Sequence, residues 1–519
     1  MEHIYTDLAI LGGGVAGMHA YKAALKSGVQ PIIIEMGPIG KTSLHCGYIP
    51  TQILRKLSLQ KTKTKGKNSN MPFLISANDA TIHNHNPLQI IKQQSQKFID
   101  NYIKDLYKIP EHNRIIGRAF FTDPHTLEIE NTNIKITAKA IIIAVGSVPH
   151  IPYFLKNFSD RVITSKQLFE IEQLPKRIAI LGTGSIGLEV GQSLSRLGVE
   201  TIFFGEDSLW HFTDEKIKKS AIASFKKNES AVMNSCITGV NKTENGIKIY
   251  YIDESKYEYF VEVDYILCAT GRRPNFKNIN IESTGIKFNN IGLPDINMFT
   301  MQTNIPHIFM AGDVSSANVN QQNAIHQGTV AGVNAALFPE TPKRVNYKKI
   351  DTILTTPQMA IVGQSYEELK EKAKTKGLRF VIGEGLFKNN YYAQIMDESD
   401  GIIHLYFNVA DRKFLGAELC GPDISHMAQL LNCSLTNNET IDKLINYRFY
   451  YPSTLELITD ACKDAYNKLN LLQIDKDGNI DAILLNNEDD DLNLDFLQDD
   501  DDKNLDESKP YIREEDFDL

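Results

Sequence analysis

The sequence predicts an α/β fold with two Rossmann-like domains and a C-terminal α+β domain. A glycine-rich turn occurs twice, about 170 residues apart, and each copy lies between an apolar strand and a helical pattern. The length of 519 residues is too great for one hydrophobic core and indicates several domains. The content of 42% hydrophobic and 23% charged residues is typical of a globular chain.

The first glycine turn is flanked by the elements of a dinucleotide site. It follows an apolar strand, opens a helix, and precedes a second strand that ends in Glu35. Gly12 permits the tight turn, Gly14 lets backbone N–H groups approach a pyrophosphate, and Gly17 lets the helix pack closely on the strand. The helix N-terminus favours phosphate groups. Glu35 is placed to accept hydrogen bonds from the ribose hydroxyls of an adenosine.

The second glycine turn repeats this pattern with Gly182, Gly184 and Gly187. Its neighbours are an apolar strand at 177–181, a helix at 188–197 and a strand at 200–204. Acidic residues, Glu206 and Asp207, follow that last strand, where a 2′-phosphate would need Arg or Lys. The second site is therefore predicted to prefer NAD over NADP. Two such sites in one chain indicate electron transfer between a bound and an exchangeable nucleotide.

Other features exclude several classes of protein. No run of about 18 apolar residues is present, so we expect no membrane span. The N-terminus lacks a signal-peptide pattern, which favours the cytoplasm. The six cysteines form no CxxC pair and no metal-ligand spacing, which predicts reduced thiols and no metal site. We expect no nucleic-acid partner.

The C-terminal segment is strongly acidic. Residues 486–519 hold 15 acidic and three basic residues, a net charge of −12, which leaves +3 on the rest of a chain whose total is −9. Such a composition predicts a solvated, disordered tail. Apolar residues between the acids keep a second interpretation open, in which the tail orders on a basic surface of its own chain or of a partner.

Several further motifs carry a resemblance to a known family. They are an exit strand and turn at 141–149, the stretch at 269–275, a second strand motif ending in Asp313, and the stretch at 356–363. In this order and spacing the chain, from about residue 4 to 470, resembles the FAD-dependent pyridine nucleotide-disulfide oxidoreductases. The resemblance implies FAD at the first turn and NAD at the second, with cofactor contacts from Thr42, Gly146, Asp313 and Gly271. It also implies a homodimer.

The resemblance also predicts domain boundaries. It implies an FAD-binding domain at 1–153 and 272–346, an NAD(P)-binding domain at 154–271, a dimerisation domain at 347–472, and the acidic, disordered tail at 473–519.

The redox disulfide that defines this family has no counterpart in the sequence. The family motif, Gly-Gly-Thr-Cys-x-x-x-Gly-Cys-Ile-Pro-Ser-Lys, aligns with residues 40–52 and places Ser43 and Tyr48 at the cysteine positions. A hydroxyl and a phenol cannot exchange disulfides. Cys46 lies between these positions and reads either as a packing thiol or as a reactive one. Tyr451 replaces the family's histidine, and a tyrosine, with a pKa of about 10, is a poor proton shuttle at neutral pH.

Within the family, the soluble pyridine nucleotide transhydrogenases are the most similar branch. They share the Tyr-Pro pair, a histidine at the position of His45, and Gln327-Gly328, although this chain lacks their first cysteine and has Gln52 in place of a lysine. The resemblance implies that Glu189 orients the nicotinamide, that Gln52 donates a hydrogen bond near flavin N5, and that Tyr48 fills the space left by the disulfide sulfur.

Two functions remain open from the sequence. The first is an FAD-dependent NAD(P)H oxidoreductase that passes hydride from NADH to FAD and on to a second nicotinamide or another acceptor without a redox disulfide. The alternative is a catalytically degenerate flavoprotein with structural FAD and a partner-binding acidic tail. Reduction of the bound flavin by NADH distinguishes them.

Overall fold

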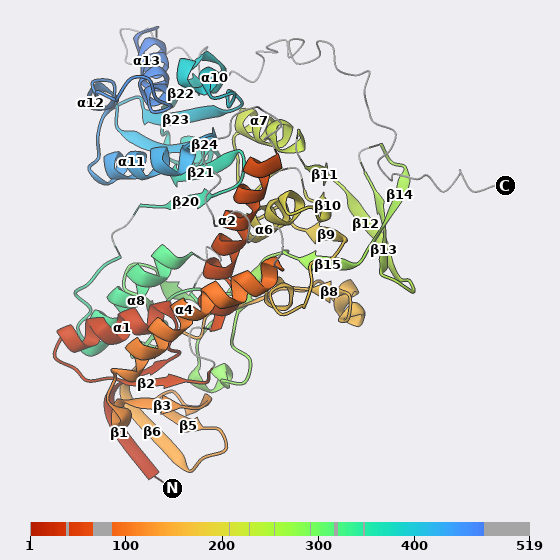
Figure 1. The fold of residues 1–519 in the computed structure, drawn as a ribbon. Coiled ribbons are helices and arrows are strands. Elements are labelled where there is room, and N and C mark those ends of the chain that lie inside the picture. The colour runs from red at the N-terminus through yellow and green to blue at the C-terminus, as the bar shows by residue number, and fades with distance from the viewer. Residues whose placement is uncertain are drawn as a thin grey trace. The chain divides into compact units, whose positions relative to one another are not determined.

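The computed structural model divides into two compact units (Figure 1). The described residues are 2–37, 41–65, 86–206, 208–227, 229–253, 255–290, 292–315, 320–345 and 348–471. The first unit comprises Met1–Gly182, Val190–Thr201 and Asp264–Asn346, and the second comprises Thr183–Glu189, Ile202–Val263 and Tyr347–Leu519. The acidic tail predicted at 473–519 lies outside the described residues.

A nine-stranded sheet forms the centre of the first unit. Its order is β17-β18-β19-β6-β1-β2-β3, with β4 and β5 paired beside β6. The strand β1 pairs in parallel with β2 and β6, and β19 pairs in parallel with β6. The bounds are β1 Glu2–Leu11, β2 Ile32–Glu35, β3 Arg114–Ile116, β4 Ala119–Asp123, β5 Thr126–Ile129, β6 Ile134–Ile143, β17 Ile296–Asn297, β18 Gln302–Thr303 and β19 Ile308–Met310.

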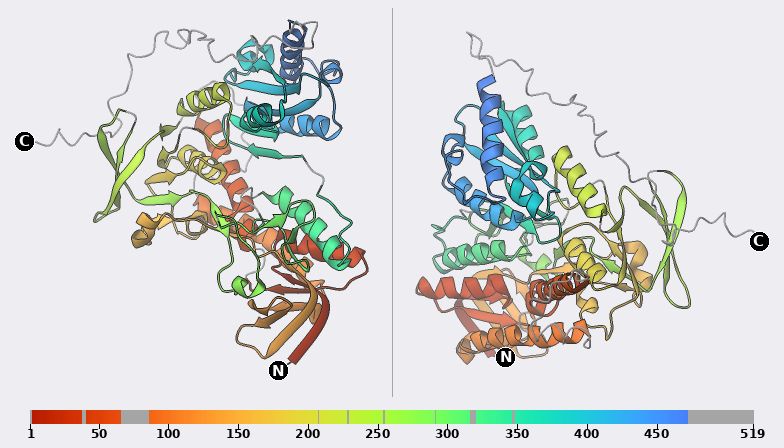
Figure 2. Two further views of the ribbon diagram at one scale, coloured as in Figure 1. Left: turned by 180° about the vertical axis from the view of Figure 1, so that it is seen from behind. Right: turned by 45° about the horizontal axis from the view of Figure 1, so that its top comes forward.

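Helices α1 and α8 lie side by side in this unit (Figures 1 and 2). The close contact requires glycine: a Cβ added to Gly328 would lie 2.2 Å from the carbonyl oxygen of Ala16, and one added to Gly332 would lie 2.3 Å from that of Ala20. The helices of the unit are α1 Val15–Lys26, α2 Tyr48–Lys65, α4 Pro87–Tyr107, α5 Ser165–Leu168 and α8 Gln321–Ala336, and a π-helical turn spans Lys41–Cys46.

The second nucleotide fold is built around β9, the glycine turn and α6. In the first unit β15 pairs in parallel with β8 and β9, and in the second unit β10 pairs in parallel with β11. The bounds are β7 Ser147–Pro149, β8 Val162–Ile163, β9 Arg177–Leu181, α6 Ser185–Arg196, β10 Glu200–Phe204, α7 Glu215–Lys226, β11 Ser230–Val232, β12 Cys236–Lys242, β13 Ile247–Ile252, β14 Glu258–Val263, β15 Tyr265–Cys268 and β16 Arg272–Pro274.

The C-terminal part of the second unit is an antiparallel sheet with helices, as predicted. The strand order is β20-β21-β24-β23-β22, and apolar side chains between the sheet and helices α11 and α13 form its core. The bounds are β20 Ile350–Ile353, β21 Gln358–Gly363, α9 Tyr366–Lys376, β22 Phe380–Leu386, α10 Tyr391–Ile395, β23 Ile402–Asn408, β24 Phe414–Gly421, α11 Ile424–Thr436, α12 Ile441–Leu444 and α13 Glu456–Leu471. In the described ranges no helix is long and apolar enough to cross a membrane.

Candidate functional site

The first glycine turn joins β1 to α1 and is packed on one side and open on the other. Gly12 has a φ of 102°, and a Cβ there would lie 2.5 Å from the carbonyl oxygen of Ala144. A Cβ on Gly17 would lie 1.8 Å from the carbonyl oxygen of Gly12. Gly14, by contrast, has no atom within 4 Å of the position its Cβ would take. The backbone at Gly14 can therefore be approached closely, as a pyrophosphate site requires.

Glu35, at the end of β2, organises this turn. Its carboxylate accepts the backbone N–H of Gly13 at 2.7 Å and that of Gly37 at 2.9 Å. On the other side of Gly13, the carbonyl oxygen accepts the hydroxyl of Tyr102 at 2.5 Å. Burial, with a smaller contribution from the charge of Glu35, raises the pKa of Tyr102 well above its usual range, so the phenol stays protonated as a donor. Tyr102 was not predicted as a site residue, because it is far from the turn along the chain.

Asp313 follows β19 and belongs to a partly buried charged group. Its Oδ2 accepts the Ser147 hydroxyl at 2.8 Å and lies 4.0 Å from Nε of Arg272. Arg272 donates to the Ser147 hydroxyl at 2.7 Å and to the Ser147 carbonyl at 2.9 Å. Burial lowers the pKa of Arg272, and the neighbouring Asp313 and Cys46 oppose this shift. Ser147 and Arg272 stand inside motifs quoted from the sequence, but neither was predicted as a site residue.

Gln327 ties the Asp313 segment to α8. Its buried Oε1 accepts the N–H of Gly312 at 2.9 Å and the Ser315 hydroxyl at 2.9 Å. Gly312 in turn lies close to the start of α1, because a Cβ there would approach the Cβ of Ala16 to 2.9 Å. The structure therefore brings the segment of Asp313 close to the start of α1, although the two are about 300 positions apart in the sequence.

The second glycine turn has the same two properties as the first. Gly182 has a φ of 103°, and a Cβ there would lie 2.5 Å from the carbonyl oxygen of Ala269, whereas Gly184 has no atom within 4 Å of its Cβ position. The third glycine, Gly187, lies in the first turn of α6. Glu206 follows β10 and its side chain is exposed. Asp207 lies outside the described residues.

Glu189, in α6, has a defined hydrogen-bond partner. Its Oε1 accepts the backbone N–H of Leu354 at 2.9 Å, just after β20. Because the donor is a backbone group, no side-chain pattern in the sequence could have indicated this contact. Glu189 is thus held by the same unit that carries the dimerisation sheet.

Comparison with known proteins decides the family. Residues 6–333 match the pyridine nucleotide-disulphide oxidoreductase family, and residues 350–462 match the dimerisation domain of the same family. The chain belongs to the pyridine nucleotide-disulfide oxidoreductases. It is therefore an FAD-dependent oxidoreductase that uses NAD(P)H, with the Rossmann-like and dimerisation folds of that family.

Relatives of this oxidoreductase extend over nearly the whole described chain. A dihydrolipoyl dehydrogenase of Geobacillus stearothermophilus is 27% identical, with 89% of this chain and 96% of the relative covered. A dihydrolipoamide dehydrogenase of Chaetomium thermophilum is 29% identical, with 89% and 91% covered. The Cu(II) complex of the HOCl-induced flavoprotein disulfide reductase RclA from Escherichia coli shares the fold, with a TM-score of 0.72, 20% identity, and 88% and 99% coverage.

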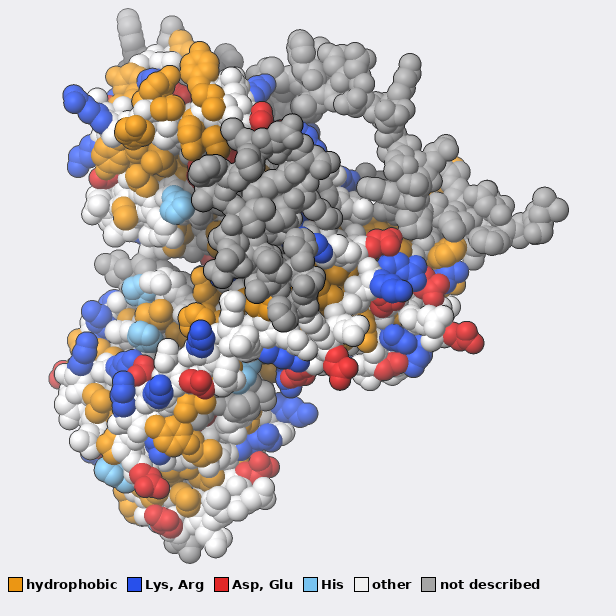
Figure 3. Space-filling view, viewed as in Figure 1, with side chains coloured by type: hydrophobic (Ala, Val, Ile, Leu, Met, Phe, Trp, Pro, Cys, Tyr) orange, Lys and Arg blue, Asp and Glu red, His pale blue; other side chains and the backbone are white. Residues whose placement is uncertain are grey.

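The dimerisation-domain match supports a homodimer of this oxidoreductase. Large apolar side chains are exposed in that part of the chain, and hydrophobic groups gather over it in Figure 3. The large exposed apolar side chains of residues 350–462 are Tyr391, Ile395, Met396, Tyr450 and Tyr451. Exposed apolar patches of this kind mark protein–protein interfaces.

The remaining predicted residues lie on turns and at the start of α2. Tyr48 begins α2 with its side chain 54% exposed, and Gln52 lies one turn later and is half-buried. Gly146 and Gly271 have φ values of 71° and 100°, which favour glycine. Thr42 is in the π-helical turn Lys41–Cys46, but the side chains of Lys41, Thr42 and Ser43 lie outside the described residues.

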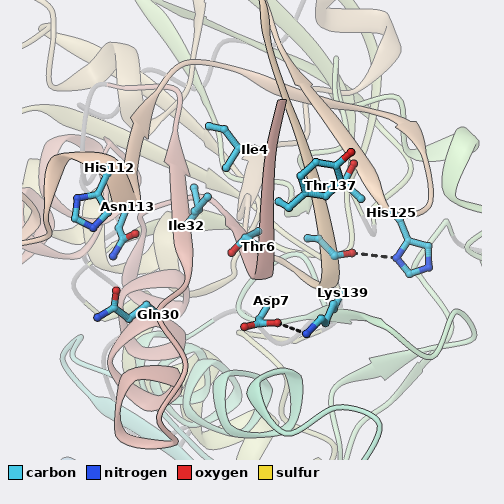
Figure 4. Close-up of a pocket in the computed structure, with 12 residues that line it drawn as sticks. Ile4, Thr6, Asp7, Gln30, Ile32, His112, Asn113, His125, Thr137 and Lys139 are labelled. Atoms are coloured by element: carbon cyan, nitrogen blue, oxygen red, sulfur yellow. Dashed lines mark hydrogen bonds and ion pairs between the residues drawn. The ribbon is translucent and has the colours of Figure 1, made fainter. Parts of the chain in front are cut away.

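A groove of about 690 Å³ lies elsewhere in the first unit (Figure 4). It is lined by the N-terminal halves of β1 and β6, where Asp7 pairs with Lys139 and the ring of His125 bonds to the Ala138 carbonyl at 3.0 Å. None of the predicted site residues line it. Cofactors bind outside the carboxyl ends of parallel strands, so this groove is at the wrong edge of the sheet for the oxidoreductase chemistry.

The described residues fit FAD and NAD(P). Each glycine turn leaves an open backbone position, at Gly14 and at Gly184, where a Cβ would meet no protein atom. In the turn before α2, the buried Nε2 of His45 has no hydrogen-bond partner among the described residues. Within the same residues, no group of three His, Cys, Asp or Glu side chains is placed to hold a metal ion.

Proposed function

We propose that this flavoenzyme transfers reducing equivalents from NADH through FAD to a second nicotinamide or another small acceptor, without a redox disulfide. The observation that carries this proposal is the combination of two intact nucleotide turns with Ser43 and Tyr48 at the positions where the family motif has cysteines. This makes the activity one of the soluble transhydrogenase type. Dihydrolipoyl substrates belong to the relatives and need a dithiol relay that these two residues cannot supply.

The residues have separate tasks in this proposal. The open backbone at Gly14 and the carboxylate of Glu35 hold the adenosine and phosphate portion of FAD. Asp313, oriented by Ser147 and Arg272, holds polar oxygens of the same cofactor. FAD, when bound, supplies the hydride-accepting and hydride-donating chemistry. The work of the protein is to position the reactants and exclude competing acceptors.

On the nucleotide side, the open backbone at Gly184 receives the pyrophosphate, and Glu206 favours a free ribose 2′-hydroxyl. Glu189 orients the nicotinamide, and its hydrogen bond to Leu354 holds the carboxylate in one place. Gln52 and Tyr48 complete the flavin side of the site. The preference is accordingly for NADH over NADPH.

The assay that tests the proposal measures reduction of thio-NAD by NADH with the FAD-loaded enzyme. We expect turnover with thio-NAD and none with dihydrolipoamide. A preparation that oxidises dihydrolipoamide at the rates of its relatives would contradict the absence of a thiol relay. Alkylation of all accessible cysteines beforehand should leave thio-NAD reduction unchanged.

The second candidate is a flavoprotein with structural FAD and a partner-binding tail. It is favoured by the loss of the lysine at Gln52, by the substitutions at Ser43 and Tyr48, and by the −12 charge of residues 486–519. In that case the protein retains FAD but neither NADH nor NADPH reduces it. Removal of residues 473–519 would then abolish partner binding and leave FAD content unchanged.

A further inference from the structure

The described residues between β10 and α7 are 205–206 and 208–214, called the 205–214 loop below, and they fold back on the second glycine turn. The backbone N–H of Trp210 donates to the carbonyl of Thr183 at 2.8 Å, and the Thr183 hydroxyl donates to the carbonyl of Ser208 at 3.1 Å. Thr183 stands between Gly182 and Gly184, so the loop contacts the centre of the turn. The loop also carries Glu206. The loop therefore lies directly against the turn that receives the nucleotide in the proposed function.

The end of this loop is held by a row of three side chains on the dimerisation sheet, of which His404 and Glu418 are buried. Glu384, His404 and Glu418 are direct neighbours across β22, β23 and β24, since Glu384 pairs with His404 and His404 with Glu418. Gly383 and Gly385 face α13 on the other side of the sheet, so strand alternation turns this row toward α7. Contacts between α7 and both β23 and β24 agree with this orientation.

Glu418 holds the loop by three hydrogen bonds and accepts a fourth from the start of α9. Its carboxylate accepts the N–H of Thr213 at 2.9 Å, the Thr213 hydroxyl at 2.5 Å, the N–H of Asp214 at 3.1 Å and the N–H of Tyr366 at 3.0 Å. Glu418 is fully buried. With so many donors, this carboxylate needs no further partner.

His404 fastens Asp214, the residue that caps α7. Asp214 Oδ1 accepts the N–H groups of Lys216 and Ile217, and its Oδ2 accepts Nδ1 of His404 at 2.7 Å. The other ring nitrogen, Nε2, lies 3.1 Å from a carboxylate oxygen of Glu384. A carboxylate oxygen can only accept, so both ring nitrogens carry hydrogen and His404 is an imidazolium. Its side chain is 4% exposed.

We propose that His404 is a positioning residue for nucleotide binding, whose imidazolium holds the 205–214 loop against the second glycine turn. The assignment rests on the proposed function, in which that turn receives the nicotinamide nucleotide. His404 touches no substrate. It acts through Asp214 and through the loop that ends there.

The charges around His404 predict how this positioning depends on pH. The groups that face His404 come from four elements: Asp214 and Lys216 of α7, Glu384 of β22, Tyr406 of its own strand β23, and Glu418 of β24. Beyond Glu384 lie Asp464 and Lys468 of α13. Burial alone would lower the pKa of His404, but the bonds to Asp214 and Glu384 outweigh it and raise the pKa to about 9. Nucleotide affinity should therefore fall as the pH rises through about 9.

The test is the dissociation constant of NADH for the FAD-loaded protein, measured by quenching of Trp210, the single tryptophan of the chain. H404Q should raise this constant roughly tenfold, a usual size for coupling between linked sites, with FAD content unchanged. The matched control is K227Q, which breaks an exposed ion pair between the C-terminal end of α7 and Asp400. It should leave the constant within about twofold of wild type.

A second variant covers the case in which H404Q does not fold. E384Q keeps the bond to Asp214 but removes one carboxylate that retains the proton, so the loss of NADH affinity should begin at a lower pH than in wild type. If H404Q has the same dissociation constant for NADH as wild type, or if E384Q and wild type have identical pH profiles, the role of His404 is overturned and the proposed function stands. Failure of the wild-type protein to bind NADH at any pH would overturn the proposed function and this proposal together.

Discussion

At the scale of single residues, Glu35 has a structural task in addition to the predicted one. Both of its oxygens accept backbone N–H groups, from Gly13 and Gly37. In E35Q an amide NH₂ must face one of these donors, which leaves a hydrogen bond unmade at a cost of about 1–3 kcal/mol. We expect FAD to bind roughly tenfold more weakly, measured as flavin absorbance retained after gel filtration. E340Q, at an exposed position, should retain FAD as wild type does.

Arg272 allows a comparison within one strand. Its guanidinium lies beside Asp313 with its side chain 11% exposed, whereas the next residue, Arg273, is exposed. R272M removes the hydrogen bonds to Ser147 and leaves Asp313 without its cation, so the free energy of unfolding should fall by about 2–3 kcal/mol. R273M should change it by less than about 0.5 kcal/mol. Equal urea midpoints for the two variants would contradict the structural role given to Arg272.

At the scale of elements, the close contact between α1 and α8 depends on two glycines of α8, Gly328 and Gly332. Alanine at these positions would favour the helix itself but would not fit the contact. In G332A the new methyl group meets the carbonyl of Ala20 at 2.3 Å. The resulting shift should cost about 1–3 kcal/mol, even though alanine favours a helix by about 1 kcal/mol. Thermal unfolding should show a lower Tm for G332A, with Q322A, on the exposed face of α8, as the control. A raised Tm in G332A would mean that the helices are not in close contact.

The elements that could be predicted from the sequence are those with a repeated local signal. The strands at 177–181 and 200–204 are found with the predicted bounds. Each is an apolar run bounded by glycine or polar residues, so the sequence marks where the strand begins and ends. Tyr102, Ser147, Arg272 and Leu354 were missed as contact residues. Each reaches its partner through the tertiary fold, and three of these contacts use a backbone atom, which no side-chain pattern reveals.

At the scale of the whole molecule, the charge pair of His404 and Glu384 on the dimerisation sheet predicts how stability varies with pH. The pKa of His404 is raised from 6.5 to about 9, so its contribution is complete below about pH 6.5 and is lost as the pH rises through about 9. The hydrogen bond from His404 lowers the pKa of Glu384 from 4.5 to about 2, so its contribution is present above about pH 4.5 and is lost as the pH falls through about 2.

The contribution of His404 and Glu384 to the free energy of unfolding should therefore be greatest between about pH 4.5 and 6.5. It should decline from about pH 6.5 toward about pH 9.5. Urea unfolding at these two values measures the decline. In H404Q the decline should be smaller, because the titrating ring is gone. The same slope in H404Q and wild type would assign the alkaline loss of stability to other groups.

The central claim for the whole molecule is reduction of a bound flavin by NADH without a protein disulfide. Its most direct test is the visible spectrum of the FAD-loaded protein, mixed with NADH in the absence of oxygen after its cysteines have been alkylated. We predict that the flavin band at about 450 nm bleaches, and that adding a second oxidised nicotinamide restores it. A flavin that stays oxidised in excess NADH, or that bleaches only before alkylation, would contradict the claim.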